Sequence, residues 1–268
     1  MTLIRESTEI SLGEGYASYE IDSEKPLKLK LTGTGHSDAF IRILNCPELT
    51  VTAEAGEGAQ MTVLFWNGNT DKMHASEKYT VKRDAALKVA YAEVEQADTE
   101  RNTDIELAET GASAVLSSAV LTGVRKEFNV RVASLAPHTD GRMQNYSVVL
   151  KGGRYVMHAT GEIVKGAVRS ESHQTSRALC FDEGMTSEIL PILLIDENDV
   201  QASHATSLGR VDEDQLYYMQ SRGLTPKQCT ALISTGYLMP VTQVIDNPQL
   251  RDELKEELER KISELCSM

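Results

Sequence analysis

The chain has 268 residues, a formal net charge of −13 and a sequence pI of about 5.0. This balance excludes the broad basic surface with which nucleic-acid binders neutralise phosphates, so neither DNA nor RNA is expected as a partner. No window of about 18 apolar residues predicts a membrane span, and the N-terminus has no secretory leader pattern. Four widely spaced cysteines without a CxxC pair fit a reducing compartment, so we expect a soluble cytoplasmic protein with no membrane partner.

Residues from about 15 to 200 predict short β-strands joined by small polar turns. Apolar positions alternate in segments such as "YASYEID", "LKLKLTG", "LTVTAE", "LKVAYAEVEQ" and "FNVRVASL". Turns such as Gly33-Thr34-Gly35 follow these segments, and no amphipathic helix interrupts them, which excludes a doubly wound α/β sheet. A sandwich, a barrel and a β-solenoid all remain possible. The brief, recurring turns favour the solenoid, although the sequence shows no exact repeat period.

After Gly209 the hydrophobic period changes from two to about 3.6 residues, which predicts helices. The first runs from Asp212 to a C-terminal glycine, Gly223, and the second begins at the capping box Thr225-Pro226-Lys227-Gln228 and ends at Gly236. These boundaries predict two domains, residues 1–208 and residues 209–268.

A third helix is predicted to begin at Asn247-Pro248. Its apolar side chains recur every four residues, which gives the helix one apolar stripe. The stripe packs either on its own domain or on another chain, and the sequence leaves both alternatives open. Its members are Leu250, Leu254, Leu258 and Ile262.

Common catalytic motifs are absent from the sequence. There is no P-loop, no G-x-G-x-x-G, no H-E-x-x-H and no G-x-S-x-G. Acidic pairs such as Asp182-Glu183 and Asp196-Glu197 allow an alternative function, a β-helix polysaccharide hydrolase or lyase that uses carboxylates. An aromatic content of 5% with a single tryptophan argues against a groove that stacks sugars.

The region from about Tyr155 to Leu238 resembles the SufB/SufD family of iron–sulfur cluster assembly proteins. The family has a G-x-I segment, an A-x-Q-x-x-R-x-L-L segment, and a longer pattern with the elements S-H-G-A-T, D-E, F-Y-L and S-R-G-I. The counterparts here are Gly161-Glu162-Ile163, then Ser172 through Leu179, then a gap-free stretch from Pro191 to Leu224 that contains Ser203-His204, Asp212-Glu213 and Ser221-Arg222-Gly223-Leu224.

This resemblance implies a mainly β fold, a right-handed parallel β-helix followed by a small C-terminal α-helical domain. It also implies a non-catalytic scaffold subunit of the SufBCD machinery, closer to SufD in a short form. Such a subunit binds the SufC ATPase through its C-terminal helices and pairs with a SufB-type subunit or with an identical copy. The residues expected to face the ATPase are Tyr217, Tyr218, Arg222 and Gly223.

The resemblance also assigns a site. His204 stands at the histidine of the SufD-type S-H-G motif, which implies an iron ligand or proton-handling residue at the subunit interface, where a transient iron–sulfur cluster is assembled without a stable cofactor. Met185 stands where SufB-type members have a sulfur-accepting cysteine, and Ala202 where SufD-type members often have one. Cys180 is the nearest thiol that could substitute, and a buried structural role is its alternative.

Overall fold

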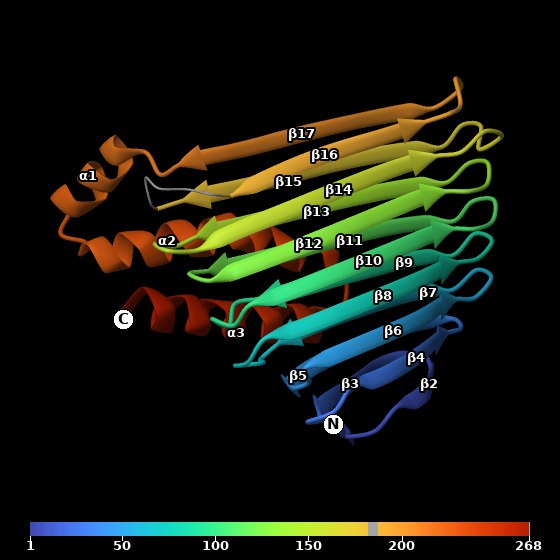
Figure 1. The fold of residues 1–268 in the computed structure, drawn as a ribbon, viewed down its shortest axis with the longest axis horizontal. Helices are drawn as coiled ribbons and strands as arrows, with labels where there is room; N and C mark the ends of the chain where they lie inside the picture. The colour runs from blue at the N-terminus through green and yellow to red at the C-terminus, as the bar shows by residue number, and fades with distance from the viewer. Residues whose placement is uncertain (182–186, 268) are drawn as a thin grey trace.

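A computed structural model describes residues 1–181 and 187–267, which form a β-solenoid followed by helices (Figure 1). The chain alternates between two sheets, so that odd-numbered strands build one sheet of nine strands and even-numbered strands build one of eight. Every pairing is parallel, for example β10 (Thr99–Leu107) with β12 (Arg125–Ser134). The prediction of a parallel β-helix with C-terminal helices is confirmed. Among the described residues, no helix is long and apolar enough to cross a membrane.

The remaining strands and helices follow in chain order. Sheet A, the nine-stranded sheet, contains β1 (Thr2–Ile4), β3 (Gly15–Asp22), β5 (His36–Asn45), β7 (Gln60–Asn67), β9 (Ala86–Glu93), β11 (Ser113–Thr122), β13 (Asp140–Val149), β15 (Glu171–Cys180) and β17 (Gln201–Arg210). Sheet B contains, besides β10 and β12, β2 (Thr8–Leu12), β4 (Leu27–Gly33), β6 (Glu48–Ala55), β8 (Met73–Val81), β14 (Arg154–Ile163) and β16 (Glu188–Ile195). The helices are α1 (Glu213–Ser221), α2 (Pro226–Leu238), the 3-10 helix η1 (Met239–Val244) and α3 (Pro248–Ser267).

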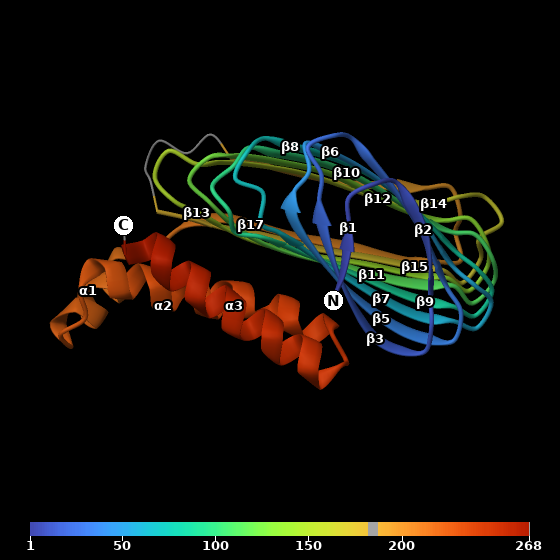
Figure 2. The same cartoon turned by 90° about the horizontal axis from the view of Figure 1, so that it is seen from below.

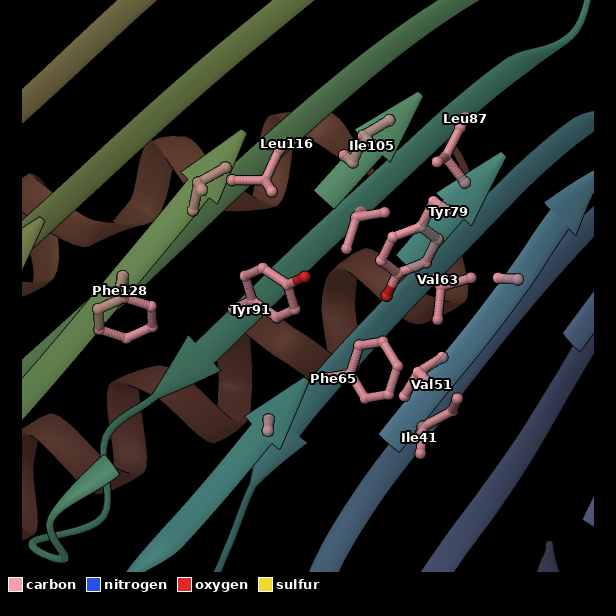
Figure 3. Packing of buried hydrophobic residues seen from close by; sticks show 14 of the residues in the cluster. Ile41, Val51, Val63, Phe65, Tyr79, Leu87, Tyr91, Ile105, Leu116 and Phe128 are labelled. Atoms are coloured by element: carbon pink, nitrogen blue, oxygen red, sulfur yellow. The ribbon is translucent and has the colours of Figure 1, made fainter. Parts of the chain in front are cut away.

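The space between the two sheets, here called the lumen, is filled by alternate side chains of every strand. In β8 and β10 each second residue is buried, because successive side chains of a strand point to opposite faces. Figure 3 shows Phe65, Tyr79 and Tyr91 gathered in this core. Each buried aromatic or aliphatic side chain of this kind contributes roughly 1.5–3 kcal/mol through the hydrophobic effect, which holds the two sheets together.

The structural repeat exists, but its length varies along the chain. Asn67 lies beside Glu93 and Thr99 beside Lys126, at separations of 26 and 27 residues. Near the N-terminal end the separation is 21 residues, and between β14 and β16 it is 32. The strands stay paired in parallel while the turns change length, and the β3–β5 pair also has a register shift at Ile21 and Asp22, which explains why no exact period is visible in the sequence.

A charged cluster lies inside the lumen among the apolar side chains. Arg101 is fully buried and forms ion pairs with Glu77 and with Glu93, the latter at 2.7 Å between Nη2 and Oε1. Lys126 completes the cluster, with its Nζ 3.5 Å from a Glu93 oxygen. Two cations thus balance two carboxylates, as a buried set of charges requires.

The C-terminal helices cover part of the outer face of sheet A (Figure 2). Leu250, Leu254, Leu258 and Ile262 of α3 are fully buried in one cluster with Trp66 and other outward side chains of the sheet. Polar contacts flank this cluster, including the Arg42 guanidinium paired with the Glu257 carboxylate. Of the two alternatives left open for the apolar stripe, packing on its own chain is therefore the one observed.

The predicted helix boundaries are confirmed with one exception. Asp212 caps α1 by accepting a hydrogen bond from the Asp214 backbone, Gly223 follows the helix at φ +94°, and the capping box between Thr225 and Gln228 opens α2. The predicted end of the second helix at Gly236 is wrong, because α2 continues to Leu238. Leu238 is fully buried against sheet A, and this packing outweighs the low helix propensity of glycine.

The same substitution is expected to have opposite effects on stability at two glycines of this region. Gly223→Ala is expected to lower the free energy of unfolding by about 1 kcal/mol, because its φ of +94° strains any residue with a Cβ atom. Gly236→Ala is expected to raise it by about 0.5–1 kcal/mol, because Gly236 is helical and exposed, and an added Cβ meets nothing within 4 Å. Urea unfolding of both variants measures the change in the free energy of unfolding. Changes of the same sign would contradict the explanation.

Candidate functional site

The solenoid ends at β16 and β17 without a further turn. In the part of the chain that the structure describes, β17 pairs with β15 on one side only, so its other edge presents unpaired backbone N–H and C=O groups. All residues of β17 except Gly209 are exposed, in contrast to the alternate burial seen in β15. This open end therefore displays side chains that an additional turn would bury.

His204 lies on this open end, in a row of residues that faces the lumen. It pairs in register with Gln174 of β15, which in turn pairs with Met143 of β13, and both of these are buried. Residues that pair in register on neighbouring strands point their side chains to the same face of the sheet, so His204 takes a lumen-facing position. It remains exposed because no strand follows it, so its imidazole is accessible to a docking partner.

Cys180 is not brought together with His204. It pairs with Arg210 at the far end of β17, six register positions away, which corresponds to roughly 20 Å along the strand. Its side chain is buried, and this burial raises the pKa of the thiol above its ordinary value. The structure thus places Cys180 as a protonated thiol in the core, on the strand next to the open end but far from His204. Met185 lies outside the described residues.

The outer face of β16 adds an apolar strip next to the open end. Leu190 and Leu194 are 45% and 52% exposed, and Ile192 lies between them on the same face of the strand. Large apolar side chains exposed together in this way mark surfaces that bind other proteins. The sequence does not single out this strip, because the same residues also fit a fully buried strand.

The residues predicted to face a partner lie on α1, which has no buried residue. Tyr217 and Tyr218 are 75% and 59% exposed, and the Arg222 guanidinium lies over the Tyr218 ring at 5.1 Å from its centroid. Gly223 ends the helix by donating its backbone N–H to the Gln220 carbonyl. Figure 2 shows α1 at the end of the helical layer, extending beyond the sheets. The structure thus brings all four residues together on one exposed helix and its cap.

The acidic pairs do not gather into a catalytic arrangement in the described residues. Glu197 accepts backbone hydrogen bonds from Asn198 and Gly166, which lower the pKa of its carboxyl to about 2. It therefore serves as an acceptor that joins two neighbouring turns. Asp182-Glu183 lies outside the described residues. Within residues 1–181 and 187–267, no three His, Cys, Asp or Glu side chains are grouped so that they could hold a metal ion.

Comparison with known proteins identifies the family of the chain. Residues 45–237 match the family model described as SUF system FeS cluster assembly, SufBD core domain. The chain belongs to the SufBD family of iron–sulfur cluster assembly proteins. The match covers most of the solenoid, β17 with His204, and helices α1 and α2.

Individual members of the SufBD family show the same relationship. The chain is 33% identical to the iron–sulfur cluster assembly protein SufD of Bacillus subtilis over 137 residues, which is 51% of this chain and 31% of SufD. It is 31% identical over 118 residues to the SufBD family protein Rv1461 of Mycobacterium tuberculosis, which is 44% of this chain and 14% of that protein. With SufB of B. subtilis it shares 25% identity over 121 residues, 45% of this chain and 26% of SufB. The chain thus matches about a third or less of these relatives and is more similar to the SufD than to the SufB of B. subtilis.

Proposed function

We propose that this SufD-like chain is a non-catalytic scaffold subunit that pairs through its open end and binds a SufC-type ATPase through α1 and α2. The observation that carries the proposal is His204, exposed in the lumen-facing row of β17, an edge strand with one free side in the described part of the chain. An additional β-strand placed against β17 would satisfy its free backbone groups and cover the imidazole. The partner at this edge is a SufB-type subunit or a second copy of the chain.

His204 supplies one nitrogen ligand or one proton-handling group for a nascent iron–sulfur cluster, which is cargo of the complex. A neutral imidazole binds ferrous iron, while the remaining ligands, thiolate or carboxylate, come from the paired subunit. The Leu190 and Leu194 side chains beside the open end contribute apolar area to the same interface.

The second surface is formed by α1 and its cap. Tyrosine and arginine are enriched at protein interfaces because they combine a large apolar area with polar ends, and Tyr217, Tyr218 and Arg222 provide this combination at high exposure. The SufC-type ATPase is the partner implied by the family relationship. Force from ATP turnover would reach the solenoid through α2, which packs on α3 and on β13.

The test is anaerobic reconstitution of the complex, co-expressed with SufB-type and SufC-type partners, using ferrous iron and sulfide. We expect His204→Ala to lower cluster content at least several-fold, measured by visible absorbance and Mössbauer spectra, while the complex still assembles. His74→Ala is the matched control, because His74 is a partly exposed histidine on the outer face of sheet B and should leave the cluster content unchanged.

Two outcomes contradict the proposal. Equal cluster content in wild type and His204→Ala would show that the imidazole is not needed for cluster assembly. Failure of the SufC-type ATPase to co-purify with the intact chain would show that α1 and α2 do not bind it.

A further inference from the structure

Two buried oxygen atoms on the strand beneath His204 have no hydrogen-bond partner among the residues that the structure describes. They are Oγ of Ser172 and Oε1 of Gln174, both on β15 and both on side chains that are 2% exposed. Leaving a buried polar atom unpaired costs roughly 1–3 kcal/mol, and such atoms mark places where a partner is expected. Both lie in lumen-facing positions directly next to the open end.

The orientation of the Gln174 amide is fixed by its other end. Its Nε2 donates a hydrogen bond of 2.8 Å to the backbone carbonyl of Ile192 on β16, so the side chain spans the lumen from one sheet to the other. Because a carbonyl accepts and cannot donate, the nitrogen must face Ile192, and the oxygen is the atom left over.

Gly161 makes room for this arrangement. A Cβ atom at this position of β14 would lie 2.3 Å from the Ser172 Oγ and 2.8 Å from the Gln174 Nε2. The glycine is therefore required where Gln174 crosses the lumen beside Ser172. The absence of a side chain at Gly161 keeps space there for polar groups between the two sheets.

His204 is the register neighbour of Gln174 on the next rung, and neighbouring strands lie about 4.8 Å apart. Its imidazole is exposed, so its side chain can rotate without losing packed neighbours. On β15 the groups Glu171, His173 and Arg177 lie on the opposite, outer face, and the Cys180 thiol faces the lumen at the other end of the strand. The lumen-facing residues of β16 are Ile189, Pro191, Leu193 and Ile195. Gln174 is thus the polar side chain in the row of His204 on the neighbouring strand.

We propose that Gln174 is a positioning residue for His204. Its Oε1 accepts a hydrogen bond from one imidazole N–H, which selects one tautomer and leaves the lone pair of the other nitrogen directed away from the chain. Ligating histidines are commonly oriented in this way by an acceptor on their second nitrogen. The use of that lone pair for iron rests on the proposed function, whereas the selection of the tautomer does not.

The test is NMR of the full chain, with ¹⁵N- and ¹³C-labelled imidazoles to measure the tautomer and the pKa of His204. Gln174→Met keeps the length of the side chain and removes the acceptor, so we expect the tautomer ratio to move toward that of free imidazole. Gln174→Glu places a carboxylate in the same position, and we expect it to raise the pKa of His204 by about one, because a nearby negative charge favours the imidazolium.

Ser172→Ala is the matched control, since it removes the other unpaired oxygen from a neighbouring row and should leave the His204 tautomer unchanged. His173 serves as an internal reference in every sample. Wild-type tautomer and pKa values in both Gln174 variants would overturn the proposal. An altered tautomer together with unchanged cluster content in reconstitution would support the positioning role and contradict the proposed function of His204.

Discussion

Arg101→Met is expected to lower the free energy of unfolding by about 3–5 kcal/mol. Removing one member of a buried ion cluster leaves the remaining charges uncompensated, and this cost is characteristic of such sites. Arg101 is fully buried, pairs with Glu77 and Glu93, and lies over the Tyr91 ring at 4.3 Å from its centroid. Methionine fills a similar volume but provides neither charge nor donors. Urea or thermal unfolding monitored by circular dichroism measures the effect.

Arg131→Met is the matched control for this prediction. Arg131 also lies between two carboxylates, Asp104 and Glu162, but on the outer face of sheet B, where its side chain is 35% exposed. Solvent screens this arrangement, so the loss should not exceed about 1 kcal/mol. Similar losses of unfolding free energy in the two arginine variants would show that burial in the lumen does not make the loss of a charge more costly than at the surface.

The same cluster predicts the acid dependence of stability. Burial disfavours the ionised form of Glu93, but the charges of Arg101 and Lys126 outweigh it and hold the pKa of this carboxyl below its ordinary value. The stabilising contribution of Glu93 is therefore present above pH 4.5 and is lost as the pH falls through the folded-state pKa. In Arg101→Met this dependence should weaken, because the main opposing charge is gone. A variant that keeps the wild-type acid dependence contradicts this assignment.

Leu254→Ala is expected to lower the free energy of unfolding by about 2–5 kcal/mol. Leu254 is fully buried between α3 and the outer face of sheet A, and truncation there leaves a cavity in addition to the lost apolar contact. Because the ion pair of Arg42 with Glu257 flanks the cluster, it holds the helix against the sheet and limits collapse into the cavity. Chemical unfolding of the full chain measures the loss.

Leu232→Ala is the matched control, since Leu232 is also a helical leucine but is 54% exposed on α2. Its loss should stay within about 0.5 kcal/mol, as for ordinary surface substitutions. If Leu254→Ala is as mild as this control, the apolar stripe of α3 does not hold the helix to the sheet.

The sequence predicts most of the fold because most strands alternate apolar and polar residues. β10 departs from this pattern, since its lumen-facing positions include Thr99, Arg101 and Thr103. Charged side chains can be buried in the lumen only because residues on other strands pair with them. The sequence of a single strand does not show these partners. The end of α2 is missed for a related reason, because the burial of Leu238 against sheet A is a tertiary effect.

The candidate site could be predicted only in part. The family resemblance points to His204 and to the exposed tyrosines of α1, and the structure places them on accessible surfaces. Gln174 appears in the sequence as one motif residue among several, because its unpaired oxygen and its crossing of the lumen depend on Gly161 and Ile192, which lie on other strands. The one available signal is that a glutamine stands in a row that is otherwise apolar on the preceding strands.

The one-sided support of β17 also has a dynamic consequence. Within residues 1–181 and 187–267, strands from β3 to β15 are hydrogen-bonded to a neighbour on each side, whereas β17 is bonded to β15 alone. Local opening is easiest where the fewest hydrogen bonds and apolar contacts must break, so amide exchange should be faster at the last rung than in the middle. His204 therefore stands on backbone that adjusts readily while the chain is alone. A strand docked against this edge would turn the last rung into an interior one and stiffen the site at the moment of assembly.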